Sequence, residues 1–277
     1  MNYYCLIAGL PDLLQDTSKN APELDDFLSL LHSELSPKDA SLLKLLLMET
    51  DNANLLALLA NKEASINPIS SISLEEWKEN LANLEDIGSL APKSPLASYM
   101  ADFYFAMQDE EIAKTIHSKE NYLASLYYEY GLHSKNSFVA RWFDFNLNIK
   151  NVLTALACKK YKWDIKEAIV GNNSIAQTIK QNVNAHDFNL TNELEAYEVL
   201  VSIADEKNLL EREKRIDALK WNWLEENSFF NYFTIERVLV FWLRIQLLHR
   251  WDNLTPEAGQ EIFRNLLQEL KKDVKFE

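Results

Sequence analysis

Glycine and proline are scarce in this chain, which has 5 glycines and 7 prolines among its 277 residues. Proteins average about 7% glycine, and glycine supplies the tight turns of β-sandwiches, dinucleotide-binding units and phosphate loops. The two cysteines, Cys5 and Cys158, lie far apart and form no Cys-x-x-Cys pair, which excludes a disulfide framework. The beginning of the chain has neither the basic region nor the long apolar run of a signal peptide. We therefore expect a reduced, cytoplasmic protein with little sheet.

Basic charge and long apolar runs are also lacking. The chain has 28 basic and 42 acidic residues, a net charge of −14, so a nucleic-acid surface could exist only as a local basic island. Its purely apolar runs, residues 45–48 for example, are far below the roughly 18 residues of a membrane-spanning helix. The 47% of hydrophobic residues nevertheless provide a core and exclude a disordered tail. We expect no nucleic-acid partner and no direct insertion into a membrane.

Helix start signals recur along the chain. Ser36 precedes Pro37 and an apolar set at helical spacing, and Ser73 with Glu76 forms the pattern of a capping box. Asp51 is a candidate cap for the following helix. Alternation with a period of two is confined to residues 3–8. The predicted fold class is all-α.

The helical spacing is nearly continuous from residue 96 to residue 130, where Gly131 is expected at the position after the helix end. A further long helix is expected over 137–161 and a short one ending at Gly171, followed by a loop at 172–174. The last third should hold helices near 193–204, 210–226 and 234–249, the last one capped by Thr234, and a final helix opened by Thr255 and Pro256.

Two prolines between Ala91 and Pro95 indicate a boundary. The stretches 96–171 and 195–271 resemble each other in layout, with paired long helices rich in aromatic residues. We therefore expect three regions: an N-terminal helical region (1–93), a central helical bundle (94–190) and a C-terminal helical bundle (191–277).

The best metal signal is the series Asp144, Asn146 and Asn148, which resembles the opening of a calcium loop. That loop needs glycine at its sixth position and a carboxylate at its twelfth, where this chain has Ile149 and Ala155. Asp144 and Asn148 share one face of a helix, so we expect them to cap or cross-link a neighbouring helix by hydrogen bonds.

No spacing of the five histidines matches a zinc or di-iron site, and no phosphate-loop, dinucleotide or nucleophile-elbow motif occurs. His186 and Asp187 could form an acid/base dyad, but adjacent residues of a loop more often face solvent. Cys158 lies on an apolar helix face, where a thiol behaves as a small hydrophobe. We predict no catalytic residue, no cofactor and no metal.

Aromatic residues are plentiful, with 7 Trp, 11 Tyr and 13 Phe. Most belong in the core, but Trp, Tyr and Arg are also the residues that anchor protein interfaces. Trp221 and Trp223 are two positions apart, so on a helix they point to different sides. The interface candidates are Trp221, Trp223, Arg237 and Trp251.

Three segments carry a resemblance to a known family. Residues 2–11, residues 233–242 and residues 250–254 resemble a bacterial family of unknown function. That family is similar in turn to the C-subunit of V/A-type rotary ATPases, known as the d-subunit in eukaryotes. The stretch from Asp144 to Gly171 resembles the pattern of an acid, Asn-Ile, a long helix and a glycine in that ATPase part, with the acid four positions before Asn148 in place of three.

The resemblance implies a funnel-like array of two to three helical bundles. It also implies a central-stalk part without catalytic activity, which couples the proteolipid ring to the shaft in ion or proton transport. The partners would be the shaft and ring subunits, the location would be cytoplasmic and peripheral to the inner membrane, and the chain would be a monomer outside the complex. Two alternatives stay open: a stand-alone helical adaptor that binds one protein, and an enzyme built from scattered acids and histidines.

Overall fold

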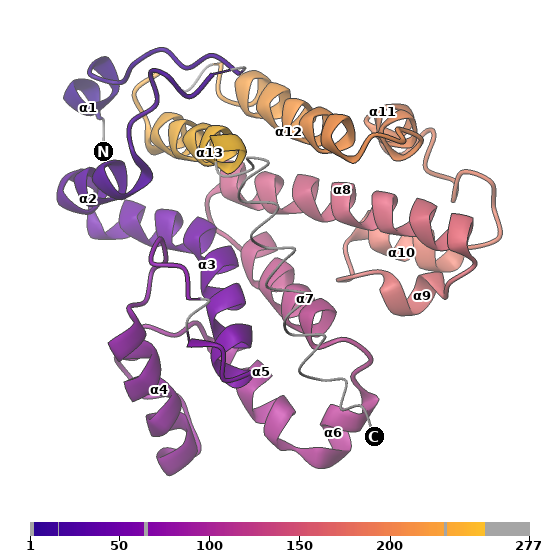
Figure 1. Cartoon of the computed structure of the whole chain (residues 1–277), viewed down its shortest axis with the longest axis horizontal. Helices are drawn as coiled ribbons and strands as arrows, with labels where there is room; N and C mark the ends of the chain where they lie inside the picture. Colours follow the sequence, from indigo (N-terminus) through magenta and orange to yellow (C-terminus); the bar gives the residue numbers. More distant parts are fainter. Residues whose placement is uncertain (1–2, 16, 64–65, 230–231, 253–277) are drawn as a thin grey trace, which may run out of the picture. The chain divides into compact units, whose positions relative to one another are not determined.

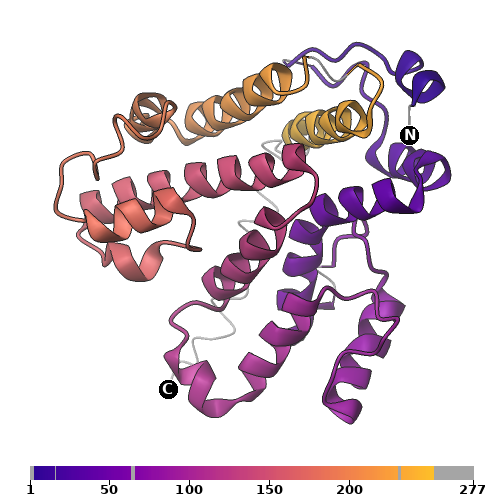
Figure 2. The same cartoon turned by 180° about the vertical axis from the view of Figure 1, so that it is seen from behind.

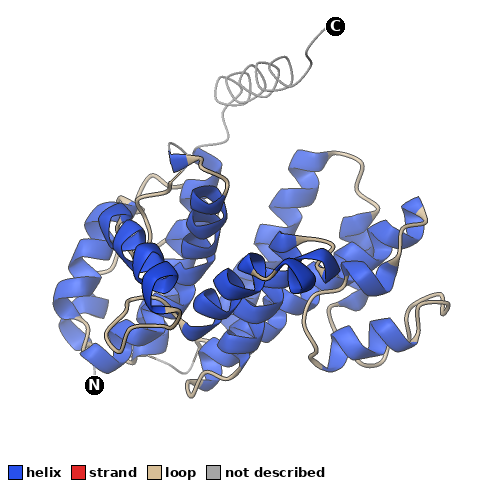
Figure 3. Ribbon diagram, turned by 90° about the horizontal axis from the view of Figure 1, so that it is seen from below, coloured by secondary structure: helices blue, strands red, loops and turns tan. Residues whose placement is uncertain are grey.

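The computed structural model describes residues 3–15, 17–63, 66–229 and 232–252, and these residues form thirteen helices and no strand (Figures 1 and 3). The all-α prediction is confirmed. Residues 3–8, the one stretch with alternating character, contain helix α1 (Tyr4–Ala8). None of the helices described combines the length and apolar character needed to cross a bilayer. The helix expected to begin at Thr255 lies outside the described residues.

The chain divides into two compact units: residues 1–36 with 214–277, and residues 37–213. The first unit thus joins the two ends of the sequence, and the boundary falls within α12 (Leu209–Glu226). The proline-rich segment 91–95 lies inside the second unit. The division of the sequence into regions 1–93, 94–190 and 191–277 stays a prediction.

In the first unit, α2 (Leu24–Glu34) packs against α13 (Ile235–Asp252). The ring of Phe27 lies 5.0 Å from that of Phe241 and 6.4 Å from that of Trp242, between ring centroids. A backbone hydrogen bond also joins the segments that precede α1 and α13, since Tyr3 N donates to Phe233 O at 2.9 Å. Burial of apolar residues from both chain ends in one core explains why these distant segments form one unit.

The second unit is built around two long helices, α3 (Pro37–Leu59) and α8 (Ser137–Tyr161). Helix α7 packs against both, and α8 also contacts the helices that follow it, as Figures 1 and 2 show for α9 and α10. The remaining helices of the unit are α4 (Leu74–Ile87), α5 (Ser98–Gln108), α6 (Glu110–Thr115), α7 (Lys119–Leu132), α9 (Ile165–Ala168), α10 (Ser174–Gln181) and α11 (Tyr197–Ala204).

Most predicted helix starts are found in the structure. Helix α3 begins at Pro37, and α8 has the predicted bounds. The capping box is complete, because Ser73 Oγ accepts from Glu76 N at 3.3 Å while Glu76 Oε2 accepts from Ser73 N at 2.9 Å. Helix α13 begins directly after Thr234, but the buried Thr234 hydroxyl makes no hydrogen bond and therefore is not a side-chain cap.

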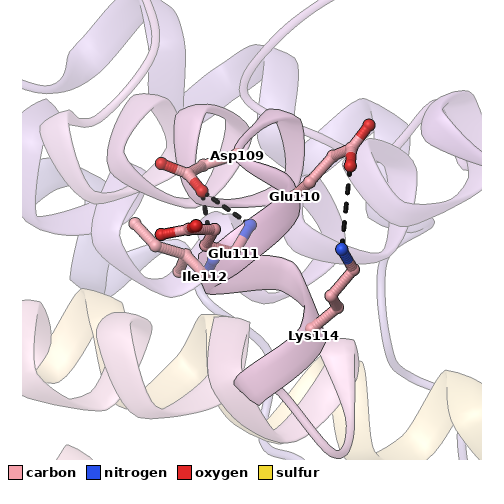
Figure 4. A network of polar contacts seen from close by, with 5 residues as sticks. All are labelled: Asp109, Glu110, Glu111, Ile112 and Lys114. Atoms are coloured by element: carbon pink, nitrogen blue, oxygen red, sulfur yellow. Dashed lines mark hydrogen bonds and ion pairs between the residues drawn. The ribbon is translucent and has the colours of Figure 1, made fainter.

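The nearly continuous helical spacing over 96–130 does not correspond to one helix, because two capping residues divide the stretch into α5, α6 and α7. Figure 4 shows the first division, where Asp109 Oδ1 accepts from Glu111 N at 2.9 Å and from Ile112 N at 3.1 Å. Ser118 caps α7 by accepting from Asn121 N at 3.1 Å. Short polar side chains that bind nearby backbone amides start a new helix even where the apolar spacing continues.

Gly131 does not end α7 as predicted, because it lies inside the helix, which continues to Leu132. Its role is steric. A Cβ atom at this position would lie 1.9 Å from Cδ1 of Phe143, whose ring is buried against the Gly131 backbone. Gly131 therefore allows the close approach of α7 and α8, the most extensive helix pair of the second unit.

Asp51 also differs from its expected role, since it lies within α3, fully buried. Its carboxylate accepts from Ser71 N at 3.1 Å and from Ser71 Oγ. One turn later, Asn54 Nδ2 donates to Asn67 O at 3.0 Å and Asn54 Oδ1 accepts from Asn67 N at 2.8 Å. The two side chains of α3 thus bind the backbone of the segment that returns from α3 to α4.

Burial raises the pKa of Asp51 to about 6, against the lowering effect of its hydrogen bonds to Ser71. The folded chain then binds a proton more tightly here than the unfolded chain, so this stabilisation is largest at low pH and is lost as pH rises through about 6. Relative to Asp51→Asn, the wild type should lose about 1 kcal/mol of unfolding free energy between about pH 5 and about pH 7. Urea unfolding of both proteins at the two pH values measures this; an unchanged difference would contradict it.

Helix α8 holds its returning segment in the same way as α3. Asn151, fully buried, donates from Nδ2 to Val170 O at 2.7 Å and accepts at Oδ1 from Val170 N at 2.9 Å. Three residues before it, Asn148 occupies the position that Asp51 holds relative to Asn54. Gly171 follows at φ +70°, and a Cβ there would lie 3.1 Å from Leu147 Cδ2. Both long helices therefore fix the next segment of chain through a buried asparagine.

Candidate interface on helices α12 and α13

The four interface candidates lie on α12 and α13, in residues that belong to the first unit. Trp221 is only 6% exposed and is part of the core. Trp223 and Trp251 are half-buried, and Arg237 is exposed. The prediction that Trp221 and Trp223 face different environments is confirmed, whereas the binding role of all four stays a prediction.

Arg244, not one of the candidates, connects the two helices. Its guanidinium carbon lies 4.5 Å from the centre of the Trp221 ring, a cation–π contact. One terminal nitrogen lies 3.5 Å from Glu225 Oε2, yet neither this nitrogen nor Nε makes a hydrogen bond. The side chain is 12% exposed, so these donors are almost removed from water.

The surroundings of Arg244 have opposite effects on the pKa of its guanidinium. Burial lowers the pKa of Arg244 and the neighbouring charge of Arg237 lowers it further, while Glu225 raises it. A partly buried guanidinium with unused donors and a second arginine close by is an arrangement that an additional carboxylate would stabilise. Arg237 and Arg244 thus form the part of this surface best suited to an acidic group.

A second ion pair links the other end of the two helices. The Arg250 guanidinium donates to both carboxylate oxygens of Asp217, at 2.9 and 3.0 Å, and it lies 5.6 Å from the ring of Trp251. Asp217 is buried and Arg250 is partly exposed, so the pair contributes to holding α12 against α13.

Most of the residues that sequence reasoning missed here follow a spacing that could have indicated them, although Arg250 does not. Asp217, Trp221 and Glu225 recur every four residues on α12 and therefore lie along one helix face. Residues 237, 244 and 251 recur every seven residues on α13 and likewise share a face. Opposite charges on two facing rows indicate an antiparallel helix pair, but only if the two helices are already known to be neighbours.

The other candidates of the sequence are placed elsewhere, in the second unit. The carboxylate of Asp187 accepts from Thr191 Oγ1 at 2.6 Å and from Asn189 N at 3.0 Å, and these hydrogen bonds lower its pKa. Through these two hydrogen bonds Asp187 stabilises the conformation of its own loop. Cys158 is buried, as expected for a small hydrophobe, and burial raises the pKa of its thiol.

Asp144 and Asn148 cross-link a neighbouring helix as predicted. Asn173, the N-cap residue of α10, donates from Nδ2 to Asp144 Oδ1 at 2.7 Å and to Asn148 Oδ1 at 2.8 Å. Asn148 in turn donates to Asp144 Oδ2 at 3.1 Å. Helix α10 is absent from the sequence prediction, which places Asn173 in a loop and not at a cap. Among the described residues, no group of three or more His, Cys, Asp or Glu side chains could hold a metal ion.

Comparison with known proteins gives one family. No curated protein and no solved structure matches the chain. The family model described as "Protein of unknown function (DUF2764)" matches residues 1–274, nearly the whole length. The chain therefore belongs to the DUF2764 family.

Proposed function

We propose that the chain is a non-catalytic component of a V/A-type rotary ATPase, similar to its C-subunit and seated between the proteolipid ring and the central shaft. In this role it couples rotation of the ring to the shaft and needs no active site. Its partners are the shaft and ring subunits, and its location is the cytoplasmic face of the membrane that carries them.

One observation carries the proposal: the residues of the resemblance to the ATPase C-subunit act together as one structural element. The acid Asp144 and the asparagine Asn148 both bind Asn173, just after the glycine that ends the similar stretch. That glycine, Gly171, adopts a positive φ over Leu147 at the other end of the same loop. The residues of the pattern thus belong to one structural element, made of the helix, the loop and the cap of the next helix. Residues that matched the pattern by chance would have no reason to contact one another in this way.

A contact that occurs on both long helices gives further support. Helices α3 and α8 each place a buried asparagine on the backbone of the returning segment, through Asn54 and Asn151. An array of similar helical bundles is what the resemblance implies. A part that transmits torque must also resist deformation, and side-chain hydrogen bonds that fix loops to long helices serve this need.

Capture of a tagged chain from detergent-solubilised membranes of its native host tests the proposal. We expect the shaft and proteolipid-ring subunits among the captured proteins. Arg237→Ala should reduce their capture through a loss of roughly 1–4 kcal/mol of binding, with the melting temperature unchanged, because Arg237 is exposed. Arg141→Ala, which removes an exposed arginine of α8, is the matched control.

A stand-alone adaptor that binds one protein is the second candidate. The unused donors of Arg244 beside Arg237 favour it, since they suit an acidic segment of a partner. The same capture experiment separates the two functions. Recovery of a different protein through Arg237, without ATPase subunits, would support the adaptor and contradict the coupling role.

A further inference from the structure

The segment 159–166, at the end of α8 and the start of α9, differs in charge from the rest of the molecule. It contains four lysines and one aspartate, a formal charge of 4 − 1 = +3, in a chain whose net charge is −14. Lys160, Lys162 and Lys166 are exposed. Figures 1 and 2 show where α8 ends and α9 follows. The segment is a small basic island on an acidic protein.

Two aromatic side chains project from this island into solvent. Tyr161 is 58% exposed and Trp163 is 66% exposed, and their rings stack at 5.2 Å between centroids with an interplanar angle of 30°. The Lys160 ammonium lies 5.8 Å from the centre of the Tyr161 ring. Rings of this size are normally removed from water, so exposing both of them together loses much of their burial free energy.

The backbone holds these rings in place. Lys162 adopts φ +61°, a conformation usual for glycine at a helix end, and Trp163 N donates to Cys158 O at 2.9 Å, which closes the last turn of α8. Lys159 fixes the same end of the helix, because its Nζ donates to Ala185 O at 2.7 Å and to His186 O at 3.0 Å. The backbone conformation at the end of α8 therefore determines the position of Tyr161 and Trp163.

We infer that this aromatic and lysine tip, residues 160–166, contacts an anionic lipid surface. Tyrosine and tryptophan favour the boundary between headgroups and acyl chains, and lysines beside them reach anionic headgroups. Each lysine near such a surface contributes roughly fivefold to the binding constant. The inference concerns the chain and lipid alone and does not depend on the proposed ATPase role.

A nucleic acid fits the tip less well than a membrane. A nucleic-acid strand needs basic residues along an extended path, whereas the lysines here are confined to residues 159–166. The two rings also stack on each other, which leaves fewer faces for bases. A lipid surface needs contact with the tip only.

Co-sedimentation of the purified full-length chain with vesicles tests the inference. We expect binding to phosphatidylcholine vesicles that contain phosphatidylglycerol, loss of binding at high salt, and little binding to pure phosphatidylcholine. The double variant Tyr161→Ala/Trp163→Ala and the double variant Lys160→Glu/Lys166→Glu should each weaken binding at least about tenfold.

Two matched variants distinguish the tip from general effects. Tyr4→Ala/Phe233→Ala removes another exposed aromatic pair, whose rings lie 4.7 Å apart without the lysine cluster, and it should leave binding unchanged. Lys93→Glu/Lys135→Glu makes the same charge change at exposed positions elsewhere and should also have little effect. Melting curves of all variants exclude unfolding as the cause.

Three results would overturn the inference. They are no binding to the anionic vesicles at low salt, equal loss in the tip and control variants, or preferential binding of a single-stranded oligonucleotide through the same tip. Recovery of ATPase subunits from native membranes has no bearing on these outcomes, so the two proposals can fail separately.

Discussion

Asn151→Ala should lower the free energy of unfolding by about 3–5 kcal/mol, because it leaves two buried backbone groups of Val170 without partners. Both groups lie in the interior, where water cannot replace the lost amide. Urea unfolding followed by far-ultraviolet circular dichroism measures the change. Asn54→Ala, which removes the corresponding contact of α3 with Asn67, should have a smaller effect, because Asn67 is exposed and water can bind its backbone groups.

A second asparagine of α8 provides the control for this prediction. Asn146 is half-buried, and within the part of the chain that the structure describes it donates only to Trp142 O of its own helix, at 2.8 Å. Asn146→Ala should therefore cost less than about 1 kcal/mol. An equal loss of unfolding free energy in Asn146→Ala and Asn151→Ala would show that the hydrogen bonds between Asn151 and the Val170 backbone contribute little to stability.

Gly131→Ala should destabilise the chain by about 1–3 kcal/mol or more, although alanine favours a helix by about 1 kcal/mol over glycine. The new methyl group would lie 1.9 Å from Phe143 Cδ1, and the ring is only 2% exposed, so it has no free space to enter. Helices α7 and α8 must then separate. Chemical denaturation again gives the loss.

The origin of this loss can be isolated by removing the ring. In a Phe143→Leu background, Gly131→Ala should be much less costly, since the nearest contacts of the added Cβ are all atoms of the Phe143 ring. Gly88→Ala is a useful contrast, because Gly88 has φ +68° and open space around it, so its cost is conformational strain alone. An additive double variant of Gly131 and Phe143 would contradict the steric explanation.

The sequence predicted the local part of the fold well. Caps such as Ser73 and the apolar spacing of α8 depend only on neighbouring residues, and both are found as predicted. The roles of Gly131 and Asp51 could not be predicted, because each depends on a side chain that arrives from another helix or loop. Asn151 reaches a backbone 19 residues away, a distance at which spacing carries no signal.

The candidate interface was predicted only in part, for a similar reason. The helices predicted over 210–226 and 234–249 contain Trp221, Trp223 and Arg237, whereas Trp251 lies beyond the predicted end of the second helix. Composition does not tell an anchor from a core residue. Trp221 is buried, and Arg244 of the other helix lies over its ring. That contact requires the pairing of α12 with α13, which no motif in either helix specifies.

The first unit combines residues 1–36 with residues 214–277, and this determines which unit can fold first during synthesis on the ribosome. Residues 37–213 are continuous, so the second unit can fold while the chain is still being made. Phe27 is buried in the folded chain, but its ring partners Phe241 and Trp242 are not available until α13 has been translated. During that interval α2 exposes an apolar helix face, and a nascent-chain chaperone would find its binding site there.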